Sequence, residues 1–321
     1  MWKYITKEQT KEFLLSLNLI DDKLNDKEKI NLLYSISNNI ENNYRIFKIK
    51  KRNGKLRTIY EPNPTLKSIQ RRILNNILNN KSVSKYAKAY KKGICLKDNA
   101  VEHLNKEIIL KLDIKDFFEN IKFSDIYDSC FSIEYFPKEI GMLLTHLCTY
   151  NNHLTQGSPT SAYISNLVMK EFDEYIGEYC EKNNISYTRY SDDLTFSGNF
   201  NPSIIIKIVR KALLKLNLEI NDNKTCIINK GNRQTVTGIT VNEKVQICSA
   251  YRKNIRKEIY YIKKFGIDSH LKFTNNNTTQ IKYLMSLKGK INYVIQINNN
   301  DQDFLKYKTY INNLLNEKRV D

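Results

Sequence analysis

The sequence predicts a mixed α+β fold built around a split βαβ sheet with helices on one face. Three observations predict it: an apolar strand ends at Asp113, two strand-like runs flank a turn at residues 190–193, and another strand-like run lies near 226–228. Stretches with helical spacing separate these runs. Strand, helix, helix, hairpin, helix, strand is the chain order of a split βαβ unit.

Length and charge restrict the class of protein. A chain of 321 residues can bury a large core and form two or three subdomains. Lys and Arg number 52 against 34 Asp and Glu, a net charge of +18, which indicates a polyanionic partner, either nucleic acid or an anionic membrane surface. No apolar run approaches the roughly 18 to 20 residues that span a bilayer, and the amino terminus lacks the apolar stretch of a signal peptide. We therefore expect nucleic acid, and no membrane, as the partner.

The cysteines and histidines show no metal or disulfide pattern. The six cysteines are scattered, and neither they nor the four histidines have the close spacing that zinc sites and disulfide frameworks require. We expect reduced, mostly buried thiols in a cytoplasmic protein.

The first half of the chain alternates helical and strand-like segments. Residues 1–40 have the apolar spacing of short helices. The stretch YRIFKIKKRNGKLRTIYEP alternates apolar and basic residues around an Asn-Gly pair at 53–54, which predicts a β-hairpin. A basic helix is expected from Leu66 to about Asn79, and KEIILKLDIKDFFENI predicts a strand ending at Asp113 followed by a helix.

The second half places helices around a second hairpin. QGSPTSAYISNLVMKEFDEYI predicts a loop and then a helix, with Ser158 as N-cap, Pro159 in the first turn and helical spacing as far as Ile176. The hairpin contains the sequence YSDD, and a helix is expected after it from 204 to 216. Two strands then follow, the run near 226–228 and another at 235–241.

Two adjacent aspartates, Asp192 and Asp193, lie inside the hairpin sequence YSDDLTFS. A turn alone would explain them, because Asp tolerates turn geometry. The split βαβ order, however, places the end of the Asp113 strand beside this hairpin, so three carboxylates are expected at one sheet edge. Their mutual repulsion requires a cation, and two Mg²⁺ ions about 3.5 to 4 Å apart would activate a hydroxyl and stabilise a leaving pyrophosphate. This is the chemistry of a nucleic-acid polymerase.

Three stretches carry a family resemblance. LKLDIKDFF, LTQGSPTSAYISN and YSDD resemble, in order and spacing, motifs A, B and C of reverse transcriptases, and the resemblance runs from about residue 44 to 300. NAVEH at 99–103 is similar to the NAxxH box of retron reverse transcriptases, and VTG at 236–238 is similar to their second signature triplet. Alone, the first box would also fit an Asn-capped helix start, and the second a strand with a Gly bulge. Because both lie in their expected places around motifs A to C, they favour the retron subgroup.

The resemblance implies a right-hand polymerase with fingers, a ferredoxin-like palm and a helical thumb. Residues 1–43 would form an amino-terminal helical segment, and residues 44–105 the fingers. Residues 106–245 would form the palm, with part of the fingers at about 125–155, and residues 246–321 would form a basic helical thumb.

The same resemblance implies roles around the metals. Asp113 and Asp192 would bridge two Mg²⁺ ions, which Mn²⁺ can replace, with the Ile114 carbonyl as a further ligand. Asp193 would orient or support the ions; the alternative is a turn residue that only adds negative field. Ser191 stands where retron enzymes more commonly have Ala, and both residues are small.

The first hairpin would supply cations to the triphosphate of a deoxynucleotide. Arg57 matches the phosphate-gripping Arg of the family, and a guanidinium suits phosphate geometry. Lys51 is the expected Lys partner, with Lys50 or Lys55 in its place if the hairpin length differs. A solvated basic strand is the alternative for each of these lysines.

Two loops complete the expected nucleotide site. Asp116 and Phe117 would offer backbone N–H groups to the triphosphate. Phe118 would be an aromatic gate beneath the sugar, with Phe117 as the competing candidate. Gln156 and Gly157 match the loop that packs on the incoming nucleotide and template, where Gly permits a close approach.

Further residues are expected to contact nucleic acid. From residue 251 onward the chain reads as helical, with 14 Lys and Arg against 6 Asp and Glu, which suits phosphate contacts along a duplex; a solvated face is the alternative. Interleaved Tyr side chains would stack on bases of a structured RNA. The expected contacts are Asn99, His103, Arg252, Lys253, Arg256 and Lys257.

The resemblance implies an RNA-directed DNA polymerase that copies part of its own structured noncoding RNA with deoxynucleoside triphosphates. It implies priming from a 2′-OH of that RNA, a branched RNA-linked DNA (msDNA) as product, and a role in anti-phage defence beside a separate effector protein. Another bacterial reverse transcriptase, diversity-generating or group II-like, is one alternative. A degenerate polymerase that acts only as an RNA-binding scaffold is another, and the three aspartates argue against it.

Overall fold

The structure is a computed structural model that describes residues 2, 4–21, 23–50 and 54–320, the last three of these by their backbone alone. The chain divides into two compact units. The first unit comprises Met1–Ile94, Leu110–Phe196 and Phe200–Ile227, and the second comprises Cys95–Ile109, Ser197–Asn199 and Ile228–Asp321.

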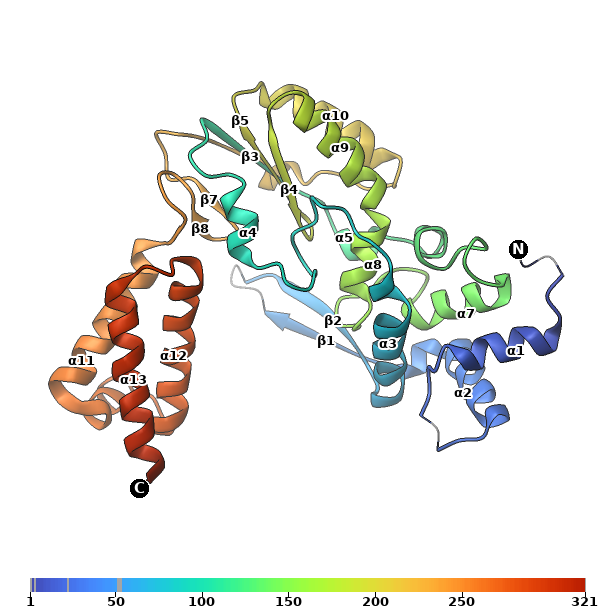
Figure 1. Cartoon of the computed structure of the whole chain (residues 1–321), viewed down its shortest axis with the longest axis horizontal. Coiled ribbons are helices and arrows are strands. Elements are labelled where there is room, and N and C mark those ends of the chain that lie inside the picture. The colour runs from blue at the N-terminus through green and yellow to red at the C-terminus, as the bar shows by residue number, and fades with distance from the viewer. Residues whose placement is uncertain (1, 3, 22, 51–53, 321) are drawn as a thin grey trace. The chain divides into compact units, whose positions relative to one another are not determined.

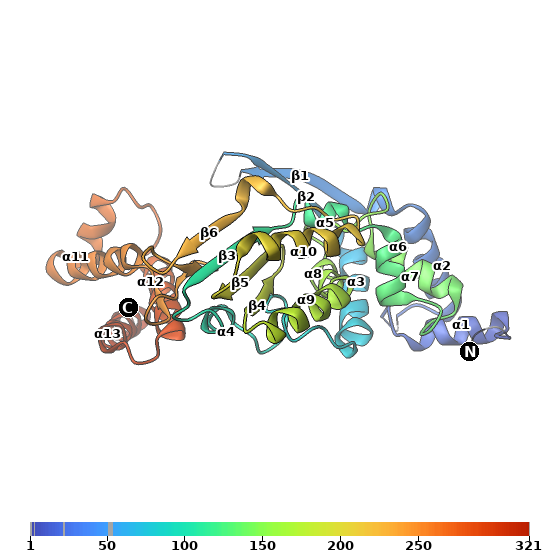
Figure 2. The same cartoon turned by 90° about the horizontal axis from the view of Figure 1, so that it is seen from above.

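The first unit contains a hairpin, a layer of helices and a four-stranded sheet (Figures 1 and 2). Its longer elements are α1 (Lys7–Ser16), α2 (Asp26–Asn38), β1 (Tyr44–Lys50), β2 (Leu56–Pro62), α3 (Pro64–Asn76), β3 (Ile108–Asp113), α7 (Lys138–Cys148), α8 (Ser161–Val168), α9 (Lys170–Lys182), β4 (Ser186–Tyr190), β5 (Asp193–Gly198), α10 (Pro202–Leu214) and β6 (Cys226–Asn229). Short helical turns are η1 (Ile40–Asn43), η2 (Leu78–Asn80), α5 (Phe117–Asn120), α6 (Phe123–Ile126), η3 (Tyr127–Phe131) and η4 (Asp222–Lys224).

The four-stranded sheet has the order β4-β5-β3-β6. Of these four strands, β3 comes first along the chain, and it lies between the third, β5, and the fourth, β6. This is the ferredoxin-like order of a split βαβ unit. In both views α9 and α10 lie on one side of this sheet. One apolar core joins them to it, with Leu112 of β3 and Phe196 of β5 buried alongside Ile176 of α9 and Val209 of α10. The expected α+β architecture is confirmed.

The hairpin of β1 and β2 pairs in antiparallel register from Tyr44 opposite Pro62 to Lys50 opposite Leu56. Seven consecutive pairs make the predicted hairpin a confirmed element. Residues 51–53 at its tip, which include Lys51 and the Asn of the predicted turn, lie outside the described residues.

The helix expected after the QGSP sequence starts later than predicted and is two helices instead of one. It begins at Ser161 with Thr160 as its N-cap, so Ser158 is not the N-cap and Pro159 lies before the first turn. The Ser158 hydroxyl instead lies 2.8 Å from Thr155 Oγ1 and 2.9 Å from Tyr44 OH. The helix also breaks at Met169, where ψ is 1°, into α8 and α9. The basic helix expected to reach about Asn79 ends as α3 at Asn76, and a 3₁₀ turn follows.

The second unit is mainly helical. Its elements are α4 (Leu96–Val101), β7 (Thr235–Val236), β8 (Ile239–Thr240), β9 (Gln246–Ile247), α11 (Ser249–Phe273), α12 (Gln280–Ile297) and α13 (Gln302–Val320). The strand expected at 235–241 is instead the hairpin β7–β8, since Thr237 and Gly238 both have positive φ (48° and 82°) and form a two-residue mirror-image turn. The Gly of the VTG box is therefore a turn residue and not a bulge.

No helix within the described part of the chain is long and apolar enough to cross a bilayer. All six cysteines are free thiols. Cys130, Cys148 and Cys180 are buried and Cys226 is exposed, so the expectation of mostly buried thiols holds for only some of them.

Candidate active site

The three predicted carboxylates come from two neighbouring segments of the first unit. Asp113 is the last residue of β3, Asp192 lies in the turn between β4 and β5, and Asp193 begins β5. A backbone hydrogen bond of 2.9 Å from Ile114 N to Asp192 O joins the two segments. Asp113 is 6% exposed, whereas Asp193 is exposed. The structure thus brings the end of β3 against the turn that contains Asp192.

Desolvation and like charge make the carboxyls of Asp192 and Asp193 hard to ionise. Although Asp193 keeps exposed surface, the surrounding protein removes part of the water from its carboxyl, and this desolvation, followed by the charges of Asp192 and Asp113, raises its pKa to about 6. The cations Lys224 and Lys111 oppose this rise without cancelling it. Burial also raises the pKa of Asp192, and the charge of Asp113 adds to the effect. A cation bound between such groups would relieve their repulsion.

Lys224 is a residue of this site that the sequence analysis missed. Its Nζ donates to Asp113 Oδ2 at 2.6 Å, and Asn221 Nδ2 donates to Asp113 Oδ1 at 3.2 Å. Burial alone would lower the pKa of Lys224, but its hydrogen bond to Asp113 and the nearby negative charges outweigh burial and raise it. The sequence NDNK at 221–224 carries only a turn signal, and the two partners are 111 residues apart. No local pattern could have revealed this pair.

The donor atoms fit a hard divalent cation such as Mg²⁺. This ion is commonly held by one or two carboxylates together with substrate phosphates, and Asp113 with Asp192 supplies that number. No group of three or more His, Cys, Asp or Glu suited to a metal exists among the residues that the structure describes. The joint binding of metal ions by Asp113, Asp192 and Asp193 stays a prediction.

The turn that contains Asp192 is strained and is held by two side chains. Ser191 has a φ of 61°, in the left-handed region that a non-glycine residue rarely adopts. Its Oγ accepts a hydrogen bond from Tyr90 OH at 3.1 Å, and its backbone O accepts one from Arg189 Nη1 at 3.1 Å. The Ser191 hydroxyl, which an alanine at this position would lack, therefore has a hydrogen-bond partner in Tyr90.

The loop after β3 separates the two neighbouring phenylalanine rings. Asp116 adopts a left-handed conformation (φ 43°) immediately before α5. Phe117 is buried at 3% exposed, and Phe118 is partly buried with its ring centroid 5.4 Å from that of Phe117. Phe118 is thus the ring of this pair with more surface available to a ligand, and its role as a sugar gate stays a prediction.

The loop of Gln156 and Gly157 packs against the first hairpin. Tyr60 N of β2 donates to Gln156 O at 2.9 Å. Gly157 has a φ of 128°, and a Cβ there would lie 2.5 Å from Tyr60 O. Close approach of β2 therefore already requires glycine at this position, before any ligand is considered.

The structure places some of the expected phosphate-binding cations of the hairpin. Arg57 in β2 lies opposite Ile49 in β1, and the side chains of Arg57, Lys50 and Lys55 are all exposed. Lys51, the expected partner of Arg57, lies outside the described residues. Arg57 is therefore accessible to a ligand, and its contact with a triphosphate stays a prediction.

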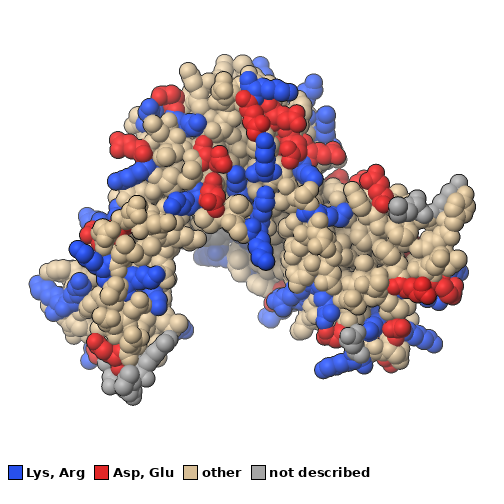
Figure 3. All heavy atoms as spheres, in the orientation of Figure 1, with Lys and Arg blue, Asp and Glu red and all other residues tan. Residues whose placement is uncertain are grey.

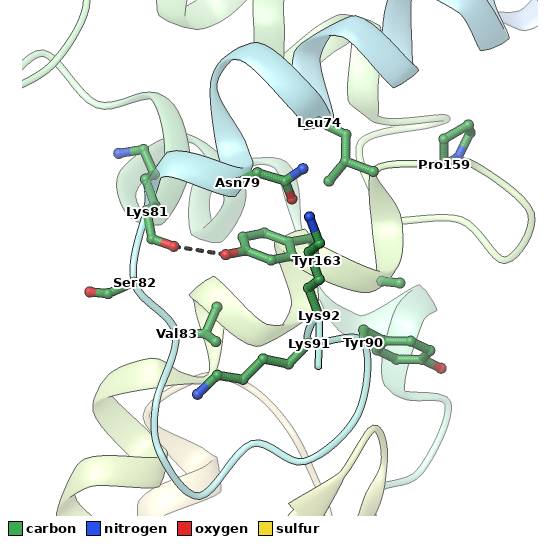
Figure 4. A pocket seen from close by; sticks show the side chains of 11 residues that line it. Leu74, Asn79, Lys81, Ser82, Val83, Tyr90, Lys91, Lys92, Pro159 and Tyr163 are labelled. Atoms are coloured by element: carbon green, nitrogen blue, oxygen red, sulfur yellow. Dashed lines mark hydrogen bonds between the residues drawn. The ribbon is translucent and has the colours of Figure 1, made fainter. Parts of the chain in front are cut away.

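A pocket of about 570 Å³ lies in the first unit between the end of α3, the segment that follows it and the start of α8 (Figure 4). Tyr163 OH donates to Lys81 O at 2.8 Å across one side of it. Tyr90, which lines the pocket, also holds Ser191 of the carboxylate turn. Cations together with aromatic rings suit a nucleotide strand, because they contact phosphates and bases respectively. The lining residues are Leu74, Asn79, Lys81, Ser82, Val83, Tyr90, Lys91, Lys92, Pro159, Ala162 and Tyr163.

The NAVEH and VTG boxes pack together inside the second unit. Asn99 Nδ2 donates to Thr237 Oγ1 at 3.4 Å, and His103 Nδ1 lies 2.7 Å from Ser197 Oγ. Asn99 and His103 are both 0% exposed. Such burial is at odds with the expected direct contact of these two side chains with nucleic acid, and their packing indicates a structural role.

The four cations expected on α11 divide into two pairs. Arg252 and Arg256 each pair with a carboxylate at the start of α13 and lie over the Phe304 ring, so both are engaged within the protein. Lys253 and Lys257 are exposed. Figure 3 shows Lys and Arg side chains over the visible face of these carboxy-terminal helices. The exposed pair is the better placed for contacts with phosphates.

Three comparisons relate the chain to known proteins. A family model described as "Reverse transcriptase (RNA-dependent DNA polymerase)" matches residues 49–285. The chain is 34% identical over 226 residues to the retron Ec86 reverse transcriptase of Escherichia coli, a match that covers 68% of this chain and 70% of that protein. It is 32% identical over 236 residues to the retron Ec83 reverse transcriptase of the same organism, with 68% and 76% covered. Among solved structures, a telomerase from Candida tropicalis in complex with a TWJ fragment of telomeric RNA matches with a TM-score of 0.47 and 14% identity, over 85% of this chain and 58% of that one.

Proposed function

The chain belongs to the reverse transcriptase family, and we propose that it copies part of its own structured noncoding RNA into DNA that stays linked to that RNA. The proposal includes priming from a 2′-OH of the RNA, a branched msDNA product, and action in the cytoplasm beside a separate effector protein in anti-phage defence. Its support is the 34% and 32% identity to proteins named as retron reverse transcriptases, together with the NAVEH and VTG boxes.

The observation that carries the proposed activity is the hydrogen bond from Ile114 N to Asp192 O, which joins the end of β3 to the carboxylate turn. In this proposal Asp113 and Asp192 would hold two Mg²⁺ ions, and the Ile114 carbonyl and Asp193 would complete the protein's donor set. Bound metal would activate the attacking hydroxyl and stabilise the leaving pyrophosphate. The protein contributes oxygen donors whose burial and mutual repulsion favour cation binding.

The deoxynucleoside triphosphate is proposed to lie between the first hairpin and the loop after β3. Arg57 would hold the triphosphate bidentately, with Lys51 or a neighbouring lysine of the hairpin beside it. The backbone N–H groups of Asp116 and Phe117 would donate to phosphate oxygens. Phe118, whose ring is only partly buried, would exclude a 2′-OH by steric conflict.

The template RNA is proposed to follow the loop of Gln156 and Gly157 and the pocket of Figure 4. Lys91 and Lys92 would contact its phosphates, and the ring of Tyr90 would contact a base. On the second unit, the exposed Lys253 and Lys257 would contribute phosphate contacts that do not depend on sequence.

DNA synthesis by the purified full-length protein on its co-purifying RNA tests this function. Labelled deoxynucleotides are expected to enter a DNase-sensitive product whose link to RNA is cut by debranching enzyme. Asp192→Asn should abolish incorporation and leave RNA binding nearly unchanged, since binding relies on distributed basic contacts. Bound RNA without synthesis in Mg²⁺ or Mn²⁺ would instead indicate an RNA-binding scaffold.

A further inference from the structure

A buried ion pair lies behind the carboxylate turn and takes no part in the proposed chemistry. Arg189 Nε donates to Asp173 Oδ1 at 2.8 Å, Arg189 Nη2 donates to Asp173 Oδ2 at 2.6 Å, and both side chains are 0% exposed. Tyr187 OH also donates to Asp173 Oδ1, at 2.8 Å. Two charges and a phenol are thus removed from water and paired with one another between β4 and α9.

The remaining edge of the Arg189 guanidinium points at the strained turn. Its Nη1 donates to the backbone O of Ser191 at 3.1 Å, and Ser191 is the residue with a φ of 61°. That carbonyl belongs to the peptide that leads into Asp192. The peptide that follows Asp192 is held as well, because its carbonyl accepts from Ile114 N at 2.9 Å. Both peptide planes beside Asp192 therefore accept a hydrogen bond, one from the Arg189 side chain of β4 and the other from the backbone that follows β3.

A buried ion pair often adds little to the free energy of unfolding. The cost of removing two charges from water often exceeds their attraction, and apolar residues of similar volume frequently serve as well or better. An arginine, however, is a rigid planar fork: once one edge is fixed on a carboxylate, the direction of its other N–H groups is fixed too. The pair is therefore suited to holding a backbone carbonyl in a conformation that the chain would otherwise avoid.

We propose that Arg189 is a positioning residue: anchored by Asp173, it holds the Ser191 carbonyl so that the left-handed turn presents Asp192 to the metal ions. This inference rests on the proposed function, since it concerns the geometry of the same carboxylates. Tyr90 also supports the turn, because its OH donates to Ser191 Oγ.

Arg189→Lys in the full-length protein tests the proposal. Lysine keeps the charge, but its single ammonium group cannot hold Asp173 and the Ser191 carbonyl in one rigid fork. Mn²⁺ affinity, measured without RNA or nucleotide by electron paramagnetic resonance of the free ion, should fall about tenfold, as is typical when a residue that orients a metal ligand is lost. The rate of synthesis should fall at least as far, and RNA affinity should stay unchanged.

Two further variants separate positioning from stability. Ile176→Ala removes a core side chain (1% exposed) from α9, the helix that contains Asp173. It should lower the melting temperature without changing Mn²⁺ affinity. The triple variant Arg189→Met, Asp173→Leu, Tyr187→Phe replaces the polar network by apolar side chains. It should melt no lower than the unchanged protein, yet lose Mn²⁺ affinity about tenfold.

A third variant tests the link to the strained turn. Adding Ser191→Gly to Arg189→Lys should recover part of the lost Mn²⁺ affinity, because glycine adopts a positive φ without steric cost. Unchanged Mn²⁺ affinity in folded Arg189→Lys, or in the folded triple variant if the lysine variant does not fold, would overturn the proposal. An equal loss in Ile176→Ala would overturn it too. An unchanged protein that binds Mn²⁺ but makes no DNA would refute the proposed function and not this inference.

Discussion

Asp193→Asn is expected to stabilise the metal-free protein while it abolishes DNA synthesis. Desolvation, then the charges of Asp192 and Asp113, raises the pKa of Asp193 from 3.8 to about 6. A raised carboxyl pKa means that the folded chain binds this proton more tightly than the unfolded chain does, so ionising Asp193 costs stability. The cost is fully present above the folded pKa and disappears as the pH falls through about 6 towards 3.8.

The size of this gain follows from the pKa and from the exposure of the side chain. A rise from 3.8 to about 6 corresponds to at most about 3 kcal/mol of unfolding free energy. Because Asp193 is exposed, water screens its charge, and about 1 kcal/mol is the appropriate expectation. Asn has nearly the same shape and cannot ionise. The free energy of unfolding of Asp193→Asn should therefore exceed that of the unchanged protein by about 1 kcal/mol at about pH 8, and should equal it near pH 4.

Urea unfolding in EDTA at these two pH values measures the gain. Added Mg²⁺ should reduce it, because a bound cation compensates the repulsion in the unchanged protein. Glu178→Gln, which neutralises an exposed carboxyl on α9, is the matched control and should show no such pH-dependent gain. A gain of equal size at both pH values, or a loss at the higher one, would refute the electrostatic reasoning. Full synthesis by Asp193→Asn would refute its role at the metals.

Three further outcomes are expected. Phe118→Ala should raise the ratio of ribonucleotide to deoxynucleotide incorporation, whereas Phe117→Ala should lower the unfolding free energy by about 3 to 5 kcal/mol; an unchanged ratio in active Phe118→Ala would reject the gate. Gly177→Ala would place a Cβ 2.0 Å from the Tyr86 ring, so calorimetry should show a loss of about 1 to 3 kcal/mol, and an unchanged melting temperature would contradict this packing. RNA affinity, titrated at several salt concentrations, should fall with a log–log slope of about −0.7 to −0.9 per phosphate contact; a flat response would show that the +18 charge is not the binding surface.

The order of the central elements could be predicted because local signals agree with the fold. The strand before Asp113 is a compact apolar run, and the hairpin and the helix after it each have one dominant periodicity. The break at Met169 could not be predicted, because apolar spacing continues through it: Ile164 in α8 and Ile176 in α9 are both buried in one core. Periodicity reports which side chains are buried and not whether one helix or two bury them.

The carboxylates of the site could be predicted from the sequence, whereas the charges that hold them could not. Asp113 ends an apolar strand, and Asp192 and Asp193 are adjacent like charges inside a predicted hairpin, so both positions are unusual for a carboxylate and indicate a ligand. The sequence predicts that Arg189 is exposed and has no special role, since a basic residue in a strand normally lies at the surface. Its burial becomes tolerable only through Asp173, 16 residues earlier on another element, just as Lys224 meets its carboxylate across 111 residues. Asp113 can be recognised from the apolar strand that it ends, whereas Arg189 and Lys224 can be recognised only from partners that the fold brings to them. The sequence pattern and the structure therefore make opposite predictions for substitutions at Arg189. The pattern treats Arg189 as a surface residue and predicts a nearly neutral effect, whereas the structure predicts weaker metal binding because Arg189 supports the turn that contains Asp192.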